Sequence, residues 1–240
     1  MISTLVFEEL AIAIIANNHN PSLLTPNFLK SNGIVPSNWE LAEPPILDSQ
    51  MARIRFTNDT IISSEFDTIT FSQTIENKAL KDVQVPEIVC KYVEKTPLAD
   101  YQGIGINPNC FITFQDENQG TFRHYISTNL LSPGTWKNFG EEPIIATLQL
   151  EYTLKQGKFN LKIDDVKFRQ TDNNHECGAL FAGGFPYAIV GDTSLEKQQH
   201  LYQLINNWQN NLKTFRELIN QRFLGKSANS YSSSLGFKKK

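Results

Sequence analysis

Apolar and polar residues alternate over residues 144–168, with one interruption at residues 155–158. A period of two residues is typical of β-strands that bury one face. The interruption contains Gly157, which can adopt a positive φ at little cost, so the pattern predicts an antiparallel hairpin. The predicted buried face comprises Ile144, Ala146, Leu148, Leu150, Tyr152 and Leu154 on the first strand and Phe159, Leu161 and Ile163 on the second.

Shorter apolar segments predict the remaining strands. Residues 5–16 have no polar face and end in an asparagine-rich segment, which indicates a buried strand followed by a turn. Residues 21–45 contain several prolines and are expected to form an ordered loop. Further strands are expected at residues 51–56, which precede a turn at 57–60, through residues 68–72, at residues 101–114 with a bend at 107–109, and at residues 179–189 with a glycine break.

Two segments carry apolar residues at helical spacing. Residues 85–95 have Pro86 in the position of a first helical turn, so a short helix is expected there. Residues 194–224 place apolar side chains on one stripe opposite Asn, Gln, Lys and Arg, and Gly225 is a typical helix end. Residues 121–131 give a weaker helical pattern.

These elements predict an α+β fold, in which an antiparallel sheet with hairpins is packed by helices on one face and the chain ends in a long C-terminal helix. Residues 1–225 are expected to form a single domain, and residues 226–240, rich in Ser and Lys, a flexible tail. Strand, hairpin and helix follow one another twice along the chain. A distant duplication would produce this order, although no repeat is found at the level of residues.

Composition limits the class of partner and the compartment. The 240 residues include 22 basic and 25 acidic side chains, a net charge of −3, so no overall field attracts the phosphate backbone of nucleic acids. Three widely spaced cysteines argue against a disulfide framework and favour the reducing cytoplasm. The apolar run at residues 10–16 is too short to span a bilayer, so no membrane association is expected.

No group of residues matches a catalytic, metal or cofactor motif. The four histidines and three cysteines lack the paired spacing of zinc ligands, and Gly103 and Gly105 lack the third glycine of a dinucleotide-binding loop. We therefore expect no catalytic residue, no metal site and no cofactor. Asp164 and Asp165 interrupt the second strand of the hairpin, and a β-bulge explains this pair better than a site does.

Two sets of side chains remain as binding candidates. A small-ligand site between the sheet and residues 21–45 would use Arg53, Arg55, His124 and Asp164, although Arg53 and Arg55 also suit a solvated outer face of a strand. The aromatic residues that follow the glycine pair at 183–184 or lie on the C-terminal helix are candidates for binding a protein partner. These partner-binding candidates are Phe185, Tyr187, Trp208 and Phe215. Uncovered residues of the helical stripe would also allow a homodimer.

Several short motifs resemble those of a group of cyanobacterial cytosolic proteins. The motifs are Asn20-Pro21, Phe28-Leu29, Gly33-Ile34-Val35-Pro36 and Trp39-Glu40, followed by the hairpin and by Tyr101 with Gly105-Ile106-Asn107. The resemblance covers most of the chain and implies a compact bacterial cytosolic domain. It implies no activity, and it fits assembly of photosynthetic or carbon-fixing complexes as well as host defence.

The sequence therefore predicts a non-catalytic protein-binding factor with an assembly, adaptor or chaperone-like role in the bacterial cytoplasm. The many aromatic residues, the edge-forming strands and the lack of a convergent catalytic set motivate this hypothesis. An enzyme or small-ligand-binding protein is the first alternative. A host-defence or nucleic-acid-associated protein is the second. Nucleic-acid binding would use the lysine tail and the arginines of the C-terminal helix, and it requires binding that depends steeply on salt.

Overall fold

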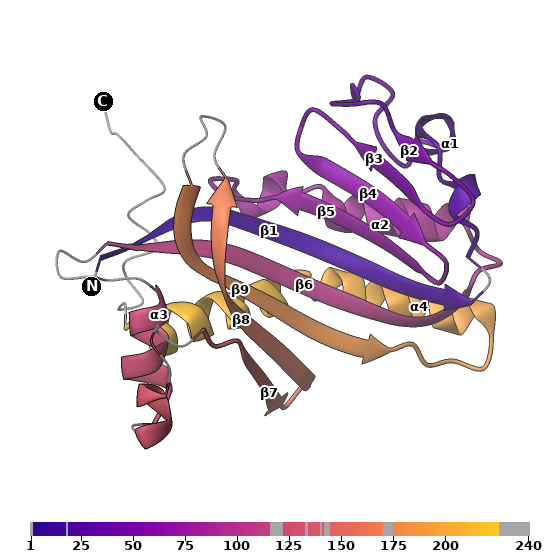
Figure 1. The fold of residues 1–240 in the computed structure, drawn as a ribbon. Helices are drawn as coiled ribbons and strands as arrows, with labels where there is room; N and C mark the ends of the chain where they lie inside the picture. The colour runs from indigo at the N-terminus through magenta and orange to yellow at the C-terminus, as the bar shows by residue number, and fades with distance from the viewer. Residues whose placement is uncertain are drawn as a thin grey trace, which may run out of the picture.

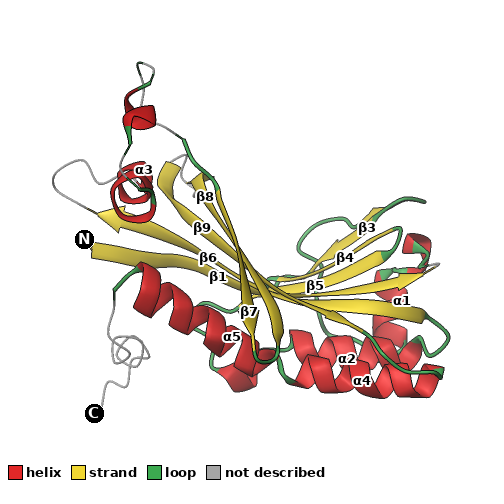
Figure 2. Ribbon diagram, turned by 90° about the horizontal axis from the view of Figure 1, so that it is seen from below, coloured by secondary structure: helices red, strands yellow, loops and turns green. Residues whose placement is uncertain are grey.

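Nine strands form one antiparallel sheet in this computed structural model, and the helices lie on one side of it (Figures 1 and 2). The structure describes residues 2–17, 19–115, 122–132, 134–139, 141, 145–169 and 175–225. The predicted α+β class and the long C-terminal helix are confirmed. The predicted tail at residues 226–240 lies outside the described residues.

Groups of strands alternate with groups of helical segments along the chain. The strands are β1 (Ile2–Asn17), β2 (Ile46–Leu47), β3 (Ala52–Arg55), β4 (Thr60–Glu65), β5 (Thr68–Thr74), β6 (Asp100–Gln115), β7 (Leu148–Leu154), β8 (Gly157–Arg169) and β9 (His175–Ala188). The helical segments are η1 (Pro21–Leu23), α1 (Pro26–Ser31), η2 (Leu80–Asp82), α2 (Val85–Lys95), α3 (Phe122–Tyr125), η3 (Ile126–Leu130), η4 (Thr135–Asn138), α4 (Ser194–Asn206), α5 (Trp208–Glu217) and η5 (Leu218–Phe223).

β1 and β6 lie side by side at the centre of the sheet, whose strand order is β2-β3-β4-β5-β1-β6-β9-β8-β7. Each central strand has 16 residues. They pair antiparallel from Ile2↔Gln115 to Asn17↔Asp100, which is the longest pairing in the sheet. Figure 1 shows both strands crossing the molecule from one end to the other.

The two halves of the chain have the same topology. In the first half, β5, β4 and β3 follow β1 outward in the sheet. In the second half, β9, β8 and β7 follow β6 outward in the same way. The helices follow the same rule, because α1 and α2 occupy the chain positions in the first half that α3 and the pair α4 and α5 occupy in the second. The topology thus supports the duplication that the order of elements suggested. Among the described elements, β2 has no counterpart.

The core lies between the sheet and the helices. Ile12 and Ile14 of β1 pair with Ile106 and Ile104 of β6, and all four side chains are buried. α2 contacts β1 and β5, whereas α4 and α5 contact β6. The helix predicted at residues 85–95 is confirmed as α2, whose buried face consists of Val85, Pro86, Ile88, Val89, Tyr92 and Val93.

Several boundaries differ from the predictions. Residues 21–45 contain η1 and α1 in addition to loop, because the Thr25 side chain accepts a hydrogen bond from Phe28 N and Pro26 occupies the first turn. The stretch through residues 60–74 is two strands, β4 and β5, with a turn between them. The expected bend at residues 107–109 and break at the glycines of β9 are absent, since β6 and β9 each continue through these positions. The C-terminal helix has a break at Asn207, between α4 and α5.

A close approach between β9 and α5 explains one of the glycines of β9. A Cβ atom on Gly183 would lie 2.7 Å from Cδ2 of Phe215 and 3.0 Å from the carbonyl oxygen of Pro108. Phe215 is buried and packs directly on the strand. Gly183 therefore allows α5 to lie close to the sheet.

We expect Gly183→Ala to destabilise the protein by about 1–3 kcal/mol, because the added methyl group overpacks a closed part of the core. Gly184→Ala is the matched control, since a Cβ atom there would meet only Asn107 Oδ1 at 3.4 Å. Urea unfolding of both variants measures the difference. Equal stability of the two variants would show that α5 can move away from β9 without cost.

A buried ion pair joins the first strand to the last helix. Arg216 of α5 donates from Nε to Glu8 Oε1 at 2.7 Å and from Nη2 to Glu8 Oε2 at 2.6 Å. Glu8 is 2% exposed. It lies on the same face of β1 as Leu10 and Ile12, and this face is the one toward the helices. The contact links residues 208 positions apart in the sequence.

Arg216→Met should destabilise the protein by about 3 kcal/mol, because it leaves the Glu8 carboxylate buried without its partner. The double variant Glu8→Leu, Arg216→Met should recover most of this loss, since both charges are then removed. Chemical denaturation at neutral pH tests both expectations. A double variant less stable than Arg216→Met would contradict this account.

Candidate functional site

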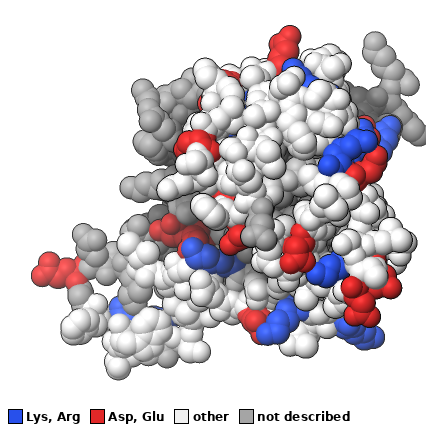
Figure 3. All heavy atoms as spheres, turned by 90° about the vertical axis from the view of Figure 1, so that its right-hand side faces the viewer, with Lys and Arg blue, Asp and Glu red and all other residues white. Residues whose placement is uncertain are grey.

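A pocket of about 430 Å³ opens at the end of the sheet where β1 ends and β6 begins. We call it the β1-end pocket. Its walls are formed by residues 17, 19, 20, 23 and 24 with Phe28, by the C-terminal end of α2, and by the connection from α2 to β6. Figure 3 views the molecule from this end and shows an area in its upper half with few charged side chains.

His19 lies on the polar side of the β1-end pocket. Its Nε2 is 2.7 Å from Ser64 Oγ, and its Nδ1 is 3.4 Å from the hydroxyl of Tyr92. The ring packs edge-on against the Tyr92 ring at a centroid distance of 6.3 Å. Burial lowers the pKa of His19, and the nearby Asp67 carboxylate partly opposes this shift. The imidazole is therefore neutral at physiological pH, with one nitrogen donating and the other accepting.

The contact between Ser64 and His19 has the composition of an activated nucleophile, since a histidine can remove the proton of a serine hydroxyl. Ser64, however, is 1% exposed, and the described lining of the β1-end pocket does not include it. A substrate in the pocket has no access to its Oγ. We interpret the hydrogen bond as one that orients His19.

Thr96 fixes the connection between α2 and β6. Its hydroxyl donates to the carbonyl oxygen of Tyr92 at 2.7 Å and lies 2.6 Å from the hydroxyl of Tyr101. The Tyr101 hydroxyl also donates to the carbonyl oxygen of Thr96 at 3.0 Å. Burial raises the pKa of Tyr101 to about 12, so this hydroxyl stays protonated and able to donate. These bonds hold the end of α2 and the residues that follow it in place.

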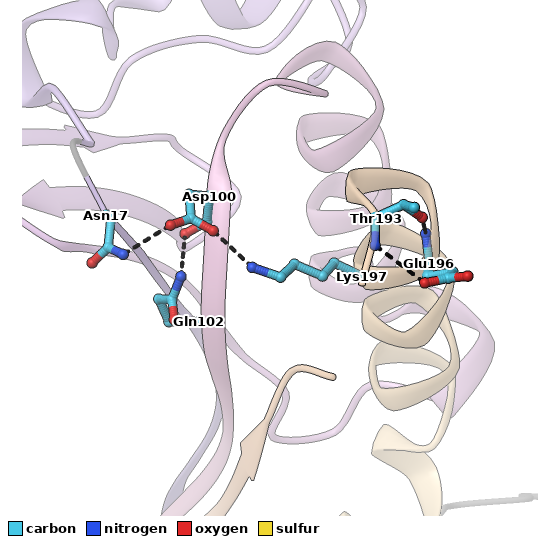
Figure 4. Close-up of polar contacts among 6 residues, drawn as sticks. All are labelled: Asn17, Asp100, Gln102, Thr193, Glu196 and Lys197. Atoms are coloured by element: carbon cyan, nitrogen blue, oxygen red, sulfur yellow. Dashed lines mark hydrogen bonds and ion pairs between the residues drawn. The ribbon is translucent and has the colours of Figure 1, made fainter. Parts of the chain in front are cut away.

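Asp100 ties three elements together at the rim of the β1-end pocket (Figure 4). Its carboxylate accepts from Asn17 Nδ2 at 2.9 Å and from Lys197 Nζ at 2.8 Å. These hydrogen bonds lower the pKa of Asp100. Lys197 is placed by the start of α4, where Thr193 and Glu196 form a capping box.

Two leucines on the rim of this pocket are exposed to solvent. Leu98, in the connection between α2 and β6, is 96% exposed, and Leu23 of η1 is 64% exposed. Phe66, in the turn between β4 and β5, is 67% exposed at the same end of the sheet. Exposed apolar side chains around an apolar pocket are typical of a surface that binds another molecule.

The predicted ligand residues do not come together. Arg53 and Arg55 lie on β3 and are exposed, whereas Asp164 lies on β8. Five strands separate β3 from β8 in the sheet, which corresponds to about 29 Å at the usual strand spacing. His124 belongs to α3, which contacts β9. The β1-end pocket borders the first part of residues 21–45, the segment beside which the small-ligand site was predicted.

The bulge interpretation of Asp164 and Asp165 is wrong. Both residues continue the ladder with β9 in regular register, as Asp164↔Leu180 and Asp165↔Ala179. Successive residues of a regular strand point to opposite faces, so the two carboxylates diverge. Asp164 forms an ion pair with Lys162 at 2.7 Å and accepts from Thr147 Oγ1 at 2.9 Å.

Three of the four predicted partner-binding residues are buried in the core. Phe185, Trp208 and Phe215 are at most 6% exposed. Phe185 stacks on Phe159 at a centroid distance of 4.4 Å. Tyr187 is half-buried, and its hydroxyl accepts from Asn211 Nδ2 at 2.7 Å. These aromatic residues hold the C-terminal helices on the sheet, so they do not form a docking surface in this structure.

Sequence reasoning missed His19, Tyr92, Thr96 and Leu98. These residues are far apart in the sequence, and β1, α2 and the start of β6 come together only in the folded structure, so no local pattern indicated the site. One signal was present in the sequence. Leu98 follows Pro97 in a connection between two regular elements, where apolar residues have no core to enter.

The second half of the chain has a pocket in the corresponding place. It measures about 390 Å³ and lies where β6 ends and β1 begins. Phe114 of β6, Tyr125 of α3 and Phe223 of η5 line it. Equivalent elements therefore build a pocket at each end of the sheet. The second one differs in charge, because Arg222 is the one charged residue among its described lining residues.

Comparison with known proteins gives no identification, since no protein-family model matches the chain and no curated protein is a significant relative. Within the described residues, no three His, Cys, Asp or Glu side chains are grouped so as to hold a metal ion. None of the described helices has the length and apolarity needed to cross a membrane.

The lowered pKa of His19 predicts a loss of stability on acidification. As pH falls through about 6.5, the unfolded chain binds a proton at His19 that the folded protein resists, so the unfolded state gains stability. The melting temperature of the wild type should therefore fall more than that of His19→Gln between about pH 7.5 and about pH 5.5. Thermal unfolding across this range is the measurement. Parallel curves for the two proteins would count against a neutral, partly buried His19.

Proposed function

We propose that this protein is a non-catalytic binding factor that holds a segment of a partner protein at the β1-end pocket. An assembly, adaptor or chaperone-like role in the bacterial cytoplasm follows from such binding. The observation that carries the proposal is the nearly complete exposure of Leu98 at the rim of an apolar pocket. Leu98 borders the pocket, so a partner anchored there would cover it together with Leu23.

The size of the pocket supports a side chain as the anchoring group. Ligand pockets have volumes of about 300–1,000 Å³, and the β1-end pocket, at about 430 Å³, lies at the small end of this range. Protein interfaces concentrate their binding energy in a few apolar or aromatic anchors that enter such pockets. Leu24, Phe28 and Ala99 provide apolar wall for an anchor.

The polar groups around this pocket suit the backbone of a bound segment. Neutral His19 can accept or donate a hydrogen bond, and the side chains of Asn17 and Asn20 contribute amides. Asp100 forms an ion pair with Lys197, and Lys95 of the lining forms one with Glu94, so the rim offers no strong net charge. This combination favours an uncharged, apolar segment over an anionic one.

The state of the nucleophilic groups supports a non-catalytic role. Burial raises the pKa of Cys90 to about 11 and that of Cys110 well above its usual value, which keeps both thiols protonated and unreactive. Ser64 is inaccessible from the pocket. Cys177 is an exposed, unpaired thiol, which suits a reducing compartment.

Leu98→Asp should reduce partner binding at least about tenfold, because it places a charge where an apolar contact is expected. Phe139→Asp is the matched control, since Phe139 is 90% exposed and follows η4, away from the β1-end pocket. The measurement is affinity isolation of tagged wild type and both variants from an extract of the native host at low salt, with quantitative mass spectrometry. Wild type and Phe139→Asp should retain one stoichiometric protein that Leu98→Asp loses.

Equal recovery of that protein by Leu98→Asp would refute docking at this pocket. Native mass spectrometry of the same samples separates the alternatives. A stoichiometric small molecule retained by the wild type in place of a protein would establish the small-ligand alternative instead.

A further inference from the structure

β7 has one unpaired edge. It is the last strand of the sheet, and among the described strands it pairs only with β8. Within the described part of the chain, its outer edge therefore presents backbone N–H and C=O groups to no neighbouring strand. Natural proteins usually protect such an edge with proline, lysine, a bulge or a covering segment. The seven residues of β7 include no proline and no lysine, and the pairing with β8 is regular from end to end.

The first half of the chain shows what covers the equivalent edge. β3 occupies the position of β7 in that half, and β2 pairs with its outer edge through Ile46↔Arg53 and Leu47↔Ala52. The apolar side chains on one face of residues 52–56 are buried, since Ala52, Ile54 and Phe56 are at most 1% exposed. An added extended segment therefore completes the sheet on that side.

The corresponding apolar side chains of β7 are only partly buried. Leu148, Leu150, Tyr152 and Leu154 share the side of the strand that faces the helices, and all four are partly exposed. No helix among the described residues makes a substantial contact with β7 or β8. The described residues thus leave both the backbone edge and the apolar side chains of β7 open, whereas they cover both on β3.

We propose that a second copy of the same chain covers this edge, with β7 antiparallel to β7 of the other copy. This surface is separate from the β1-end pocket, so the inference does not rest on the proposed function. A two-fold axis at Glu151 gives the register that pairs all seven residues of the strand. In that register Leu148 lies opposite Leu154 of the other copy and Leu150 lies opposite Tyr152, so the two apolar rows join on the helix side.

The charges near the edge permit this pairing. Glu151 would face Glu151 of the second copy, but Lys158 lies 2.9 Å from each Glu151 carboxylate and compensates its charge. Lys162 and Asp164 of β8 form a second compensated pair at 2.7 Å. The described charges on this side of β7 and β8 therefore sum to zero, and two copies meet without net repulsion.

The C-terminal helix is a poorer candidate for a dimer interface. Leu201, Ile205, Leu212 and Phe215 of its apolar stripe are at most 1% exposed within the chain itself. The predicted association through uncovered residues of this stripe would have only Leu204 and Leu218, both partly buried, to use. The edge of β7 is available without any rearrangement.

Sedimentation velocity on three proteins tests the inference. The wild type should form a dimer. Q149K/T153K should raise the dissociation constant at least about tenfold, because residue 149 lies opposite residue 153 of the other copy and two like-charge pairs result. Q149K/T153E is the matched control, since the same pairs then attract and the dimer should persist. Both residues are exposed, so the monomer should remain folded in each variant, as circular dichroism verifies.

Hydrogen exchange identifies the surface that is used. The amides of β7 should be protected in the wild-type dimer and exchange rapidly in Q149K/T153K. A wild type that stays monomeric at the highest soluble concentration would overturn the proposal. So would a dimer that Q149K/T153K leaves intact, or a dimer in which the β7 amides exchange freely, since either result places the interface elsewhere. A strand supplied by a different protein would appear as a monomer in this experiment and would likewise overturn it.

Discussion

The antiparallel pairing of β1 with β6 is the constraint on which the rest of the structure depends. These two strands belong to different halves of the chain, and each half adds its remaining strands outward from its own central strand. The helices then have one face to cover, and α2 and α5 meet it on opposite sides of the central pair. The ion pair between Glu8 and Arg216 spans this arrangement, because it joins the first strand of one half to the last helix of the other. In a low-dielectric interior such a pair opposes separation of the halves, since either charge alone would be left without compensation.

The pseudo-symmetry gives the two halves similar frameworks and different surfaces. The central strand of each half ends beside a pocket, but only the first pocket has His19 and a rim with exposed leucines. Each half also ends in an outer strand, but β2 covers only one of the two. The differences lie in the connecting segments, which are the parts of a fold that can change without disturbing the central sheet. A framework of two halves with the same topology, one pocket with an exposed apolar rim and one open edge would suit the partner binding and the self-association that we propose.

Local pattern was enough to predict many of the elements. The alternation at residues 144–168 and the helical spacing at residues 85–95 each reflect a face that must be buried, and both elements are present. Local pattern could not predict Glu8 as a core residue, because Arg216, which compensates its charge, lies 208 positions away in the sequence. It also could not separate exposed aromatic residues from buried ones. Phe185 and Phe215 were equally compatible with a docking surface and with the core until the position of α5 on the sheet was known.

The amino-acid sequence by itself determined the class of fold, the hairpin, the main helices and the near-neutral charge, because each depends on neighbours within a few residues or on composition alone. The tertiary structure decided which residues form the site and which surfaces stay open. His19, Tyr92 and Leu98 meet at the β1-end pocket although they come from separate elements, and Arg53 and Asp164 lie far apart although both were chemically suitable. A pocket and a strand edge are properties of segments that meet in space, so no local pattern specifies them.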